Sequence, residues 1–218
     1  MFKIRISVLL VIATLLAGCG GLASLTGSGN VVTQEEAITG FDRLDVSHGF
    51  QVAVRQGGTF SVIIRVNDDL VEDLTVVKQG STLKIGLKPG LSYNLENATL
   101  EADVTMPELT GADLAGGSHL VGDVEIGDVV FNLSGGSHVT LSGSAGDLTV
   151  AANGGSHAKL ADLLVVNASV DARGGSHATV NPSGTLDAVV KGGSHVRYLG
   201  SPTLGTIDTD GSSSFKQE

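Results

Sequence analysis

The chain has 218 residues and a formal net charge of −10, because 23 acidic residues outnumber 13 basic ones. Such acidity argues against nucleic acid or anionic lipid as a binding partner, and it also serves plain solubility. Hydrophobic residues make up 41% of the chain and aromatic residues 4%, which predicts one domain with an aliphatic core.

The chain begins with the pattern of a secretory signal peptide. Lys3 and Arg5 precede an apolar run over residues 6–16 that is too short to span a bilayer comfortably. The sequence Leu16-Ala17-Gly18-Cys19 resembles the lipobox of bacterial lipoproteins. This resemblance implies cleavage after residue 18 and a diacylglycerol on the sulfur of Cys19. The remaining chain keeps 11 basic and 23 acidic residues, so its formal charge becomes −12.

The expected organisation has three parts. Residues 1–18 are the signal peptide, residues 19–30 are the lipidated Cys19 with a flexible Gly/Ser tether, and residues 31–218 are a single folded domain. Cys19 is the only cysteine, so the chain forms no internal disulfide. Because Gly20 follows it in place of Asp, the lipoprotein resemblance implies an outer-membrane location, on the periplasmic or the surface face.

The second half of the chain carries a repeated tetrapeptide. GGSH begins at residues 116, 135, 154, 174 and 192, and residues 210–213 form a decayed sixth copy. The intervals are 19, 19, 20 and 18 residues, and self-similarity at such a period indicates stacked units. Apolar residues alternate with polar ones between the motifs, as in residues 138–141, which is the period of a β-strand. The sequence predicts an all-β fold, a right-handed parallel β-helix or solenoid with rungs of about 19 residues.

The first half predicts β-rich rungs without an obvious shared register. Expected strands cover residues 50–54, 60–66, 74–77, 83–87 and 100–106. This strand order, the segments "FDRLDVSHGFQVAVRQGG", "STLKIGL" and "ADVTMPELTGADLAGGSH", and the Gly-rich rungs that follow resemble the putative auto-transporter adhesin head (GIN) domain family over residues 38–215. The resemblance implies a β-helical, secreted or lipid-anchored protein, and it assigns no role to the histidines, because Gly, Ser or Ala usually stands there in the family.

The tetrapeptide predicts a corner followed by an outward column of side chains. Paired glycines supply the corner, since a tight change of direction often needs positive φ. They are Gly116, Gly117, Gly135, Gly136, Gly154, Gly155, Gly174, Gly175, Gly192 and Gly193. The serines are expected to hydrogen-bond along the stack or to cap backbone groups. They are Ser118, Ser137, Ser156, Ser176 and Ser194.

The histidines that end each tetrapeptide are expected to line one flank of the rod. They are His119, His138, His157, His177 and His195. Steps of about 4.8 Å would let adjacent imidazoles share a divalent transition metal such as Zn, Cu or Ni at bonds of about 2.0 Å. The alternative is that stacked planar side chains simply pack well and that recent duplication copied the tetrapeptide. His48 shares the Ser-His pair, and its membership of the column stays open.

The sequence does not indicate an enzyme. Ser and His adjacent on a strand point to opposite sides, so GGSH is not a nucleophile with its base, and the aspartates lie at scattered offsets. Three hypotheses remain: a binding or adhesive module for an envelope glycan or protein, a metal-binding lipoprotein, and a structural envelope spacer. Further expected partners are the membrane, through the lipid anchor, and other copies of the chain, end to end or as a homo-oligomer.

Overall fold

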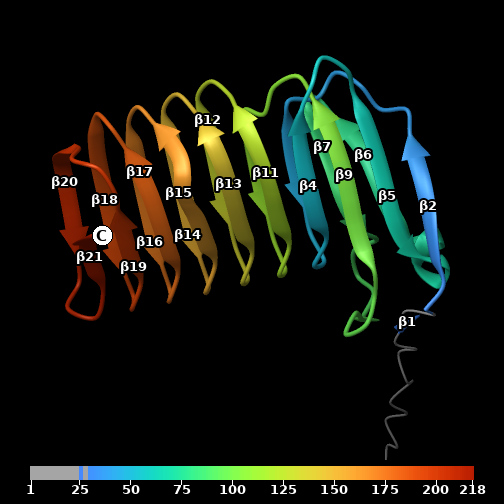
Figure 1. Cartoon of the computed structure of the whole chain (residues 1–218). Coiled ribbons are helices and arrows are strands. Elements are labelled where there is room, and N and C mark those ends of the chain that lie inside the picture. The colour runs from blue at the N-terminus through green and yellow to red at the C-terminus, as the bar shows by residue number, and fades with distance from the viewer. Residues whose placement is uncertain (1–24, 27–28) are drawn as a thin grey trace, which may run out of the picture.

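The computed structural model describes residues 25–26 and 29–218 and confirms the expected parallel β-solenoid. Strands make up 61% of the chain and helix 3%, and the solenoid has about six turns spaced about 19 residues apart. Two sheets face one another along the rod, as Figure 1 shows. Each later rung contributes one strand to each sheet, and a Gly-Gly corner joins the two.

One sheet has ten strands. In spatial order it contains β2 (Val31–Glu36), β5 (Ser61–Asn67), β9 (Leu100–Met106), β4 (Gln51–Gln56), β11 (His119–Glu125), β13 (His138–Ser144), β15 (His157–Val165), β17 (His177–Pro182), β19 (His195–Tyr198) and β21 (Ser214–Gln217). From β4 to β21 all neighbours pair in parallel, whereas β5 pairs antiparallel with both β2 and β9.

The second sheet has nine strands and lies behind the first. In spatial order it contains β20 (Thr203–Thr209), β18 (Thr185–Lys191), β16 (Ala168–Arg173), β14 (Leu148–Asn153), β12 (Val129–Leu133), β10 (Gly111–Leu114), β3 (Arg43–Val46), β7 (Thr82–Leu87) and β6 (Leu74–Gln79). A 3-10 helix, η1 (Asp68–Asp73), connects β5 to β6. Within the expected tether, β1 (Leu25–Thr26) pairs with β8 (Tyr93–Asn94).

The rungs of the first half do not stack in sequence order. The rung made by β3 and β4 lies between the rung of β7 and β9 and the rung of β10 and β11. The strands expected from the sequence in this half correspond to β4, β5, β6, β7 and β9, whereas β2, β3, β8 and η1 were not expected. Parallel pairing therefore runs continuously from β7 and β9 to the last rung.

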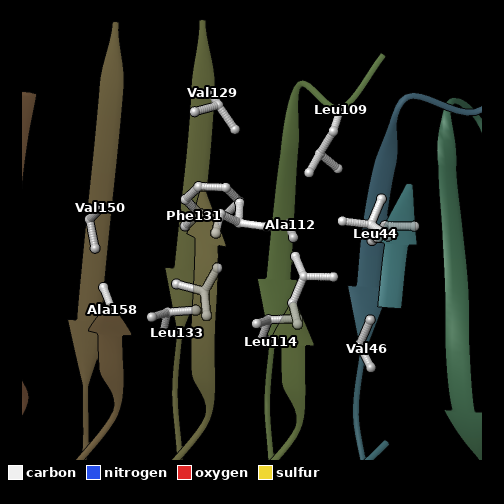
Figure 2. Packing of buried hydrophobic residues seen from close by; sticks show 14 of the residues in the cluster. Leu44, Val46, Leu109, Ala112, Leu114, Val129, Phe131, Leu133, Val150 and Ala158 are labelled. Carbon is white, nitrogen blue, oxygen red and sulfur yellow. The ribbon is translucent and has the colours of Figure 1, made fainter. Parts of the chain in front are cut away.

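The core is a thin aliphatic layer between the two sheets. Alternate residues point inward, so Val139 and Leu141 are buried while the residues between and beside them face outward. In the nine-stranded sheet one inward column contains Leu44, Ala112 and Phe131, so that a small side chain lies between two large ones (Figure 2). This packing holds the outward residues of each rung in register with those of the next.

Candidate functional site

Each Gly-Gly corner places the following serine and histidine. The first glycines have φ of +61 to +66° and the second +75 to +78°, in the left-handed region that a side chain disfavours. The N–H of Gly117 donates to the carbonyl of Gly135, and the same bond recurs from Gly136 to Gly154. The corners are therefore stacked as regularly as the strands.

The five serines are buried inside these corners. Each has 0% of its surface exposed. The hydroxyl of Ser176 donates to the carbonyl of Arg173 at 2.8 Å and accepts from the N–H of Ser156 at 3.2 Å. Ser194 likewise accepts from the N–H of Ser176. Ser176 thus performs both expected roles, capping a carbonyl within its rung and linking one rung to the next, while Ser118, Ser137 and Ser156 cap a carbonyl and Ser194 links two rungs.

The five histidines form one continuous column on the ten-stranded sheet. Strand pairing aligns His119, His138, His157, His177 and His195 in successive rungs. Neighbouring ring centroids lie 4.4, 4.7, 4.9 and 4.9 Å apart. The first three ring pairs are within 4° of parallel and the last is tilted by 36°, where His195 is hydrogen-bonded to Ser214. We call this set of five residues the histidine column.

Two members of the histidine column have a lowered pKa. Partial burial lowers the pKa of His138 below its ordinary value of 6.5, and the charges of His119, His157 and Lys159 lower it further. Burial also lowers the pKa of His177, together with the charges of its two neighbours in the column and of Arg197. Repulsion adds to the effect of burial, since neighbouring imidazolium ions would be less than 5 Å apart.

A second outward column runs beside the histidines. Its members from β11 to β21 are Val121, Thr140, Lys159, Thr179, Arg197 and Lys216. Between them, the two columns carry eight side chains that are cationic or become so by protonation, and no carboxylate. Among the described residues, Lys159 and Lys216 form no salt bridge, whereas Arg197 contacts Glu218 at 3.0 Å. No single residue type occupies this second column, so the sequence repeat does not mark it.

The cationic part of the face is hollowed into a shallow groove. A depression of about 230 Å³ lies over β15, β17 and β19. Its outward lining residues are His157, Lys159, His177, Thr179, His195 and Arg197. We call it the basic groove.

A second groove lies at the other end of the histidine column. It has a volume of about 420 Å³ and includes Gln51, Glu101 and His119 in its lining. Gln51 and Glu101 continue the histidine column toward the first half of the chain. Arg65, also in this groove, is bound by Asp103 at 2.6 Å and by Glu101 at 3.6 Å, so its charge is matched by carboxylates. This extension follows from the pairing of β4 with β11 and β9, and the sequence carries no local signal for it.

His48 does not join the histidine column. Because Val46 pairs with Leu114 and Gln51 with His119, His48 occupies the place of Gly116 at a corner. It adopts φ of +63°, and its Nδ1 lies 2.8 Å from the Ser47 hydroxyl and accepts from the N–H of Leu87 at 3.3 Å. Burial lowers its pKa. Its ring is therefore held at the corner, by Ser47 and by Leu87 of β7.

The stacked rings are poorly arranged to share a metal ion. Adjacent rings are separated by 4.4 Å or more, while two metal–nitrogen bonds together reach about 4 Å. Their nitrogen lone pairs lie in parallel planes, so the rings would have to turn toward each other before binding one ion. Among residues 25–26 and 29–218, no group of three or more His, Cys, Asp or Glu side chains is placed to hold a metal.

The segment expected to be a signal peptide, residues 1–18, and the expected lipidation site Cys19 lie outside the described residues. Within the described part of the chain, no helix is both long and apolar enough to cross a membrane.

Comparison with known proteins identifies the family. The model of the family "Putative auto-transporter adhesin, head GIN domain" matches residues 40–202. The chain belongs to this family. Its GIN domain thus includes the histidine column, the basic groove and all the rungs from β3 to β19. No match is found among curated proteins.

Solved structures share the fold of this GIN domain. A "putative adhesin" from Bacteroides fragilis aligns with a TM-score of 0.68 and 20% identity, covering 89% of this chain and 100% of that one. A "putative lipid binding protein" from Parabacteroides distasonis gives a TM-score of 0.54 at 18% identity, with coverage of 89% and 99%. At these identities the likeness extends to the fold alone.

Proposed function

We propose that the protein is a non-enzymatic binding module, of the adhesin-head kind, displayed from the bacterial envelope by a lipid on Cys19. The observation that carries this proposal is the exposed face of the ten-stranded sheet, on which a rigid solenoid holds five imidazoles in one column. Binding residues are commonly positioned in this way by a rigid scaffold. Membership of an adhesin-like family supports the same conclusion.

The arrangement of the GGSH residues supports a non-enzymatic role. The serine hydroxyls are buried and donate to backbone carbonyls, as that of Ser137 does to Ser134 at 2.7 Å, so they are not presented to a substrate. The imidazoles are stacked side by side in one column, whereas a catalytic site needs different groups that converge on one reacting atom. A repeated, uniform surface fits recognition of an extended ligand better than chemistry at one bond.

Binding is tested with the full chain, purified in detergent and labelled, on whole bacterial and host cells. The variant with Asn at all five column positions is expected to lose most of the cell-bound signal. A control variant carries Thr149→Asn and Ser169→Asn on the outward face of the nine-stranded sheet and is expected to bind like the wild type. Equal binding by all three proteins would remove the histidine column from the function.

The lipid anchor is tested separately by expressing the full chain with labelled palmitate in a diderm bacterium. The wild type is expected to carry the label and to sediment with outer membranes, and Cys19→Ser is expected to lose both properties. Labelling that persists in Cys19→Ser would refute the anchor and leave the binding proposal intact.

A further inference from the structure

The two outward columns of the binding face differ in charge from the rest of the molecule. The chain carries a formal net charge of −10, yet the two outward columns from β11 to β21 hold five histidines, two lysines and one arginine without a carboxylate. Segregation of this kind focuses a positive potential on one surface and favours an anionic ligand there.

Hydroxyls and cations alternate over four rungs of the second column, from β13 to β19, before Lys216 follows Arg197 directly. Thr140, Lys159, Thr179 and Arg197 follow one another on successive rungs. The charged heads therefore recur every second rung, about 10 Å apart, with a hydroxyl between them. An unbranched chain lying along the rod would meet alternating sites for an acidic group and for a neutral hydrogen-bonding group.

We propose that the basic groove and the adjoining histidine column bind a linear, carboxylate-bearing polysaccharide that lies along the solenoid axis. Lys159 and Arg197 contact its carboxylates, the two threonines contact its hydroxyls, and the edges of His157, His177 and His195 line the other side of the chain. This inference rests on the proposed function, because it names the ligand class for the same face.

The chemistry of the face favours a polysaccharide over a nucleic acid. Single-stranded nucleic acids are held largely by stacking of bases on exposed aromatic faces. The outward positions of the described strands β11 to β21 contain no Phe, Tyr or Trp. The imidazole faces cover one another within the histidine column, which leaves mainly the ring edges with their polar nitrogens for a ligand.

Binding is coupled to protonation of the column. While neutral, the stacked imidazoles add no charge to the groove. Burial, together with the charges of His157, His195 and Arg197, lowers the pKa of His177, and a carboxylate beside the ring favours its protonated form and offsets part of that shift. Lys159 and Arg197 also line the groove, and His138, Lys216 and Glu218, the partner of Arg197, occupy neighbouring positions. At the far end of the column, Glu101 and Asp103 lie with Arg65, next to His119. The ligand therefore binds more tightly as the pH falls below 7.

The test uses the full chain in detergent and three probes at constant ionic strength: hyaluronan as the carboxylated polysaccharide, dextran as the neutral one, and single-stranded DNA as a different polyanion. Affinities are measured at pH 5.5 and pH 7.5. Hyaluronan is expected to bind at least about tenfold more tightly at pH 5.5, as uptake of a single proton allows. Dextran bound as tightly as hyaluronan, or DNA bound more tightly, would overturn the proposal.

Variants assign the effect to the groove. The pair Lys159→Gln and Arg197→Gln is expected to weaken hyaluronan binding by about tenfold or more at both pH values, since each removes a charge-assisted contact. The matched pair Arg173→Gln and Lys191→Gln removes the same charges from the nine-stranded sheet and is expected to have little effect. Equal losses in the two pairs would reduce the interaction to net charge and overturn the site.

The histidines have a separate variant. Asn at positions 157, 177 and 195 is expected to abolish the pH dependence while circular dichroism stays that of the wild type, and a pH dependence that survives would overturn the coupling. Binding to cells that depends on the column, without binding to hyaluronan at either pH, would refute this inference and leave the proposed function standing.

Discussion

The histidine column makes the stability of the fold depend on pH through its neighbouring pairs. Because folding lowers the pKa of His138 and His177 below 6.5, the folded state binds fewer protons than the unfolded chain in that range. The column's contribution to stability is therefore complete above about pH 6.5 and is lost as the pH falls through the folded pKa values.

The magnitude follows from the ring spacing. Two unit charges at 4.4–4.9 Å repel by about 0.9 kcal/mol at the dielectric constant of water, and by more at a partly buried site. For these solvent-facing rings the lower figure applies, so four neighbouring pairs together cost on the order of 3 kcal/mol when fully protonated.

Two double variants separate the number of imidazoles from their pairing. His138→Asn with His177→Asn breaks all four pairs and leaves three rings about 9 to 10 Å apart, where repulsion is halved and salt screens it further. His119→Asn with His195→Asn removes as many rings but leaves two pairs in contact around His157. Both variants replace planar side chains on the same face by the same residue.

Urea unfolding of the three proteins at pH 7.5 and pH 5.0 measures the effect. Protonation of carboxylates changes the unfolding free energy of all three proteins alike. Beyond that shared change, the unfolding free energy is expected to fall from pH 7.5 to pH 5.0 by about 3 kcal/mol in the wild type, about 2 kcal/mol in the His119/His195 variant and less than about 1 kcal/mol in the His138/His177 variant. Equal losses in the two double variants would refute pairwise coupling within the column.

The remaining predictions concern the corners and the metal hypothesis. Ser176→Ala removes a capping bond and leaves the N–H of Ser156 without its acceptor, so urea unfolding is expected to show a loss of about 2–3 kcal/mol in stability. Ser118→Ala is expected to cost only about 1 kcal/mol, because among the described residues the Ser118 hydroxyl forms only the bond to a carbonyl. Gly143→Ala is expected to cost more than about 2 kcal/mol, or to prevent folding, because φ is +104° and a Cβ would meet the carbonyl oxygen of Val124. Calorimetric titration with Zn, Cu and Ni is expected to give the wild type no heat beyond that of the variant with Ala at all five column positions; a saturable signal lost in that variant would establish the metal alternative.

The second half of the chain could be predicted because its signals are local and repeated. A nearly constant interval between GGSH motifs sets the rung length, and the strand period assigns Val139 inward and His138 outward. Parallel pairing then brings the histidines into one column. The glycine pairs and the serines follow from the same register, since each corner has the same backbone conformation.

The first half could not be predicted to the same depth, because its pairing is non-local. Nothing in the segment of residues 43–56 indicates that its rung lies between two rungs that come later in the chain. The positions of Gln51 and Glu101, in line with the histidine column, depend on that order. His48 resembles the repeat in its Ser-His letters, but the matching register is that of Val46 with Leu114, which moves it to a corner.

The most direct test of the account is nuclear magnetic resonance of the full chain with labelled histidine, titrated with hyaluronan at pH 6. The chain contains six histidines, five in the column and His48 at a corner that does not line the basic groove, so the protein carries its own control. The account predicts that ring signals of the column move toward their protonated positions on binding while those of His48 stay in place. Unchanged column signals at saturating hyaluronan, or a shift confined to His48, would contradict it.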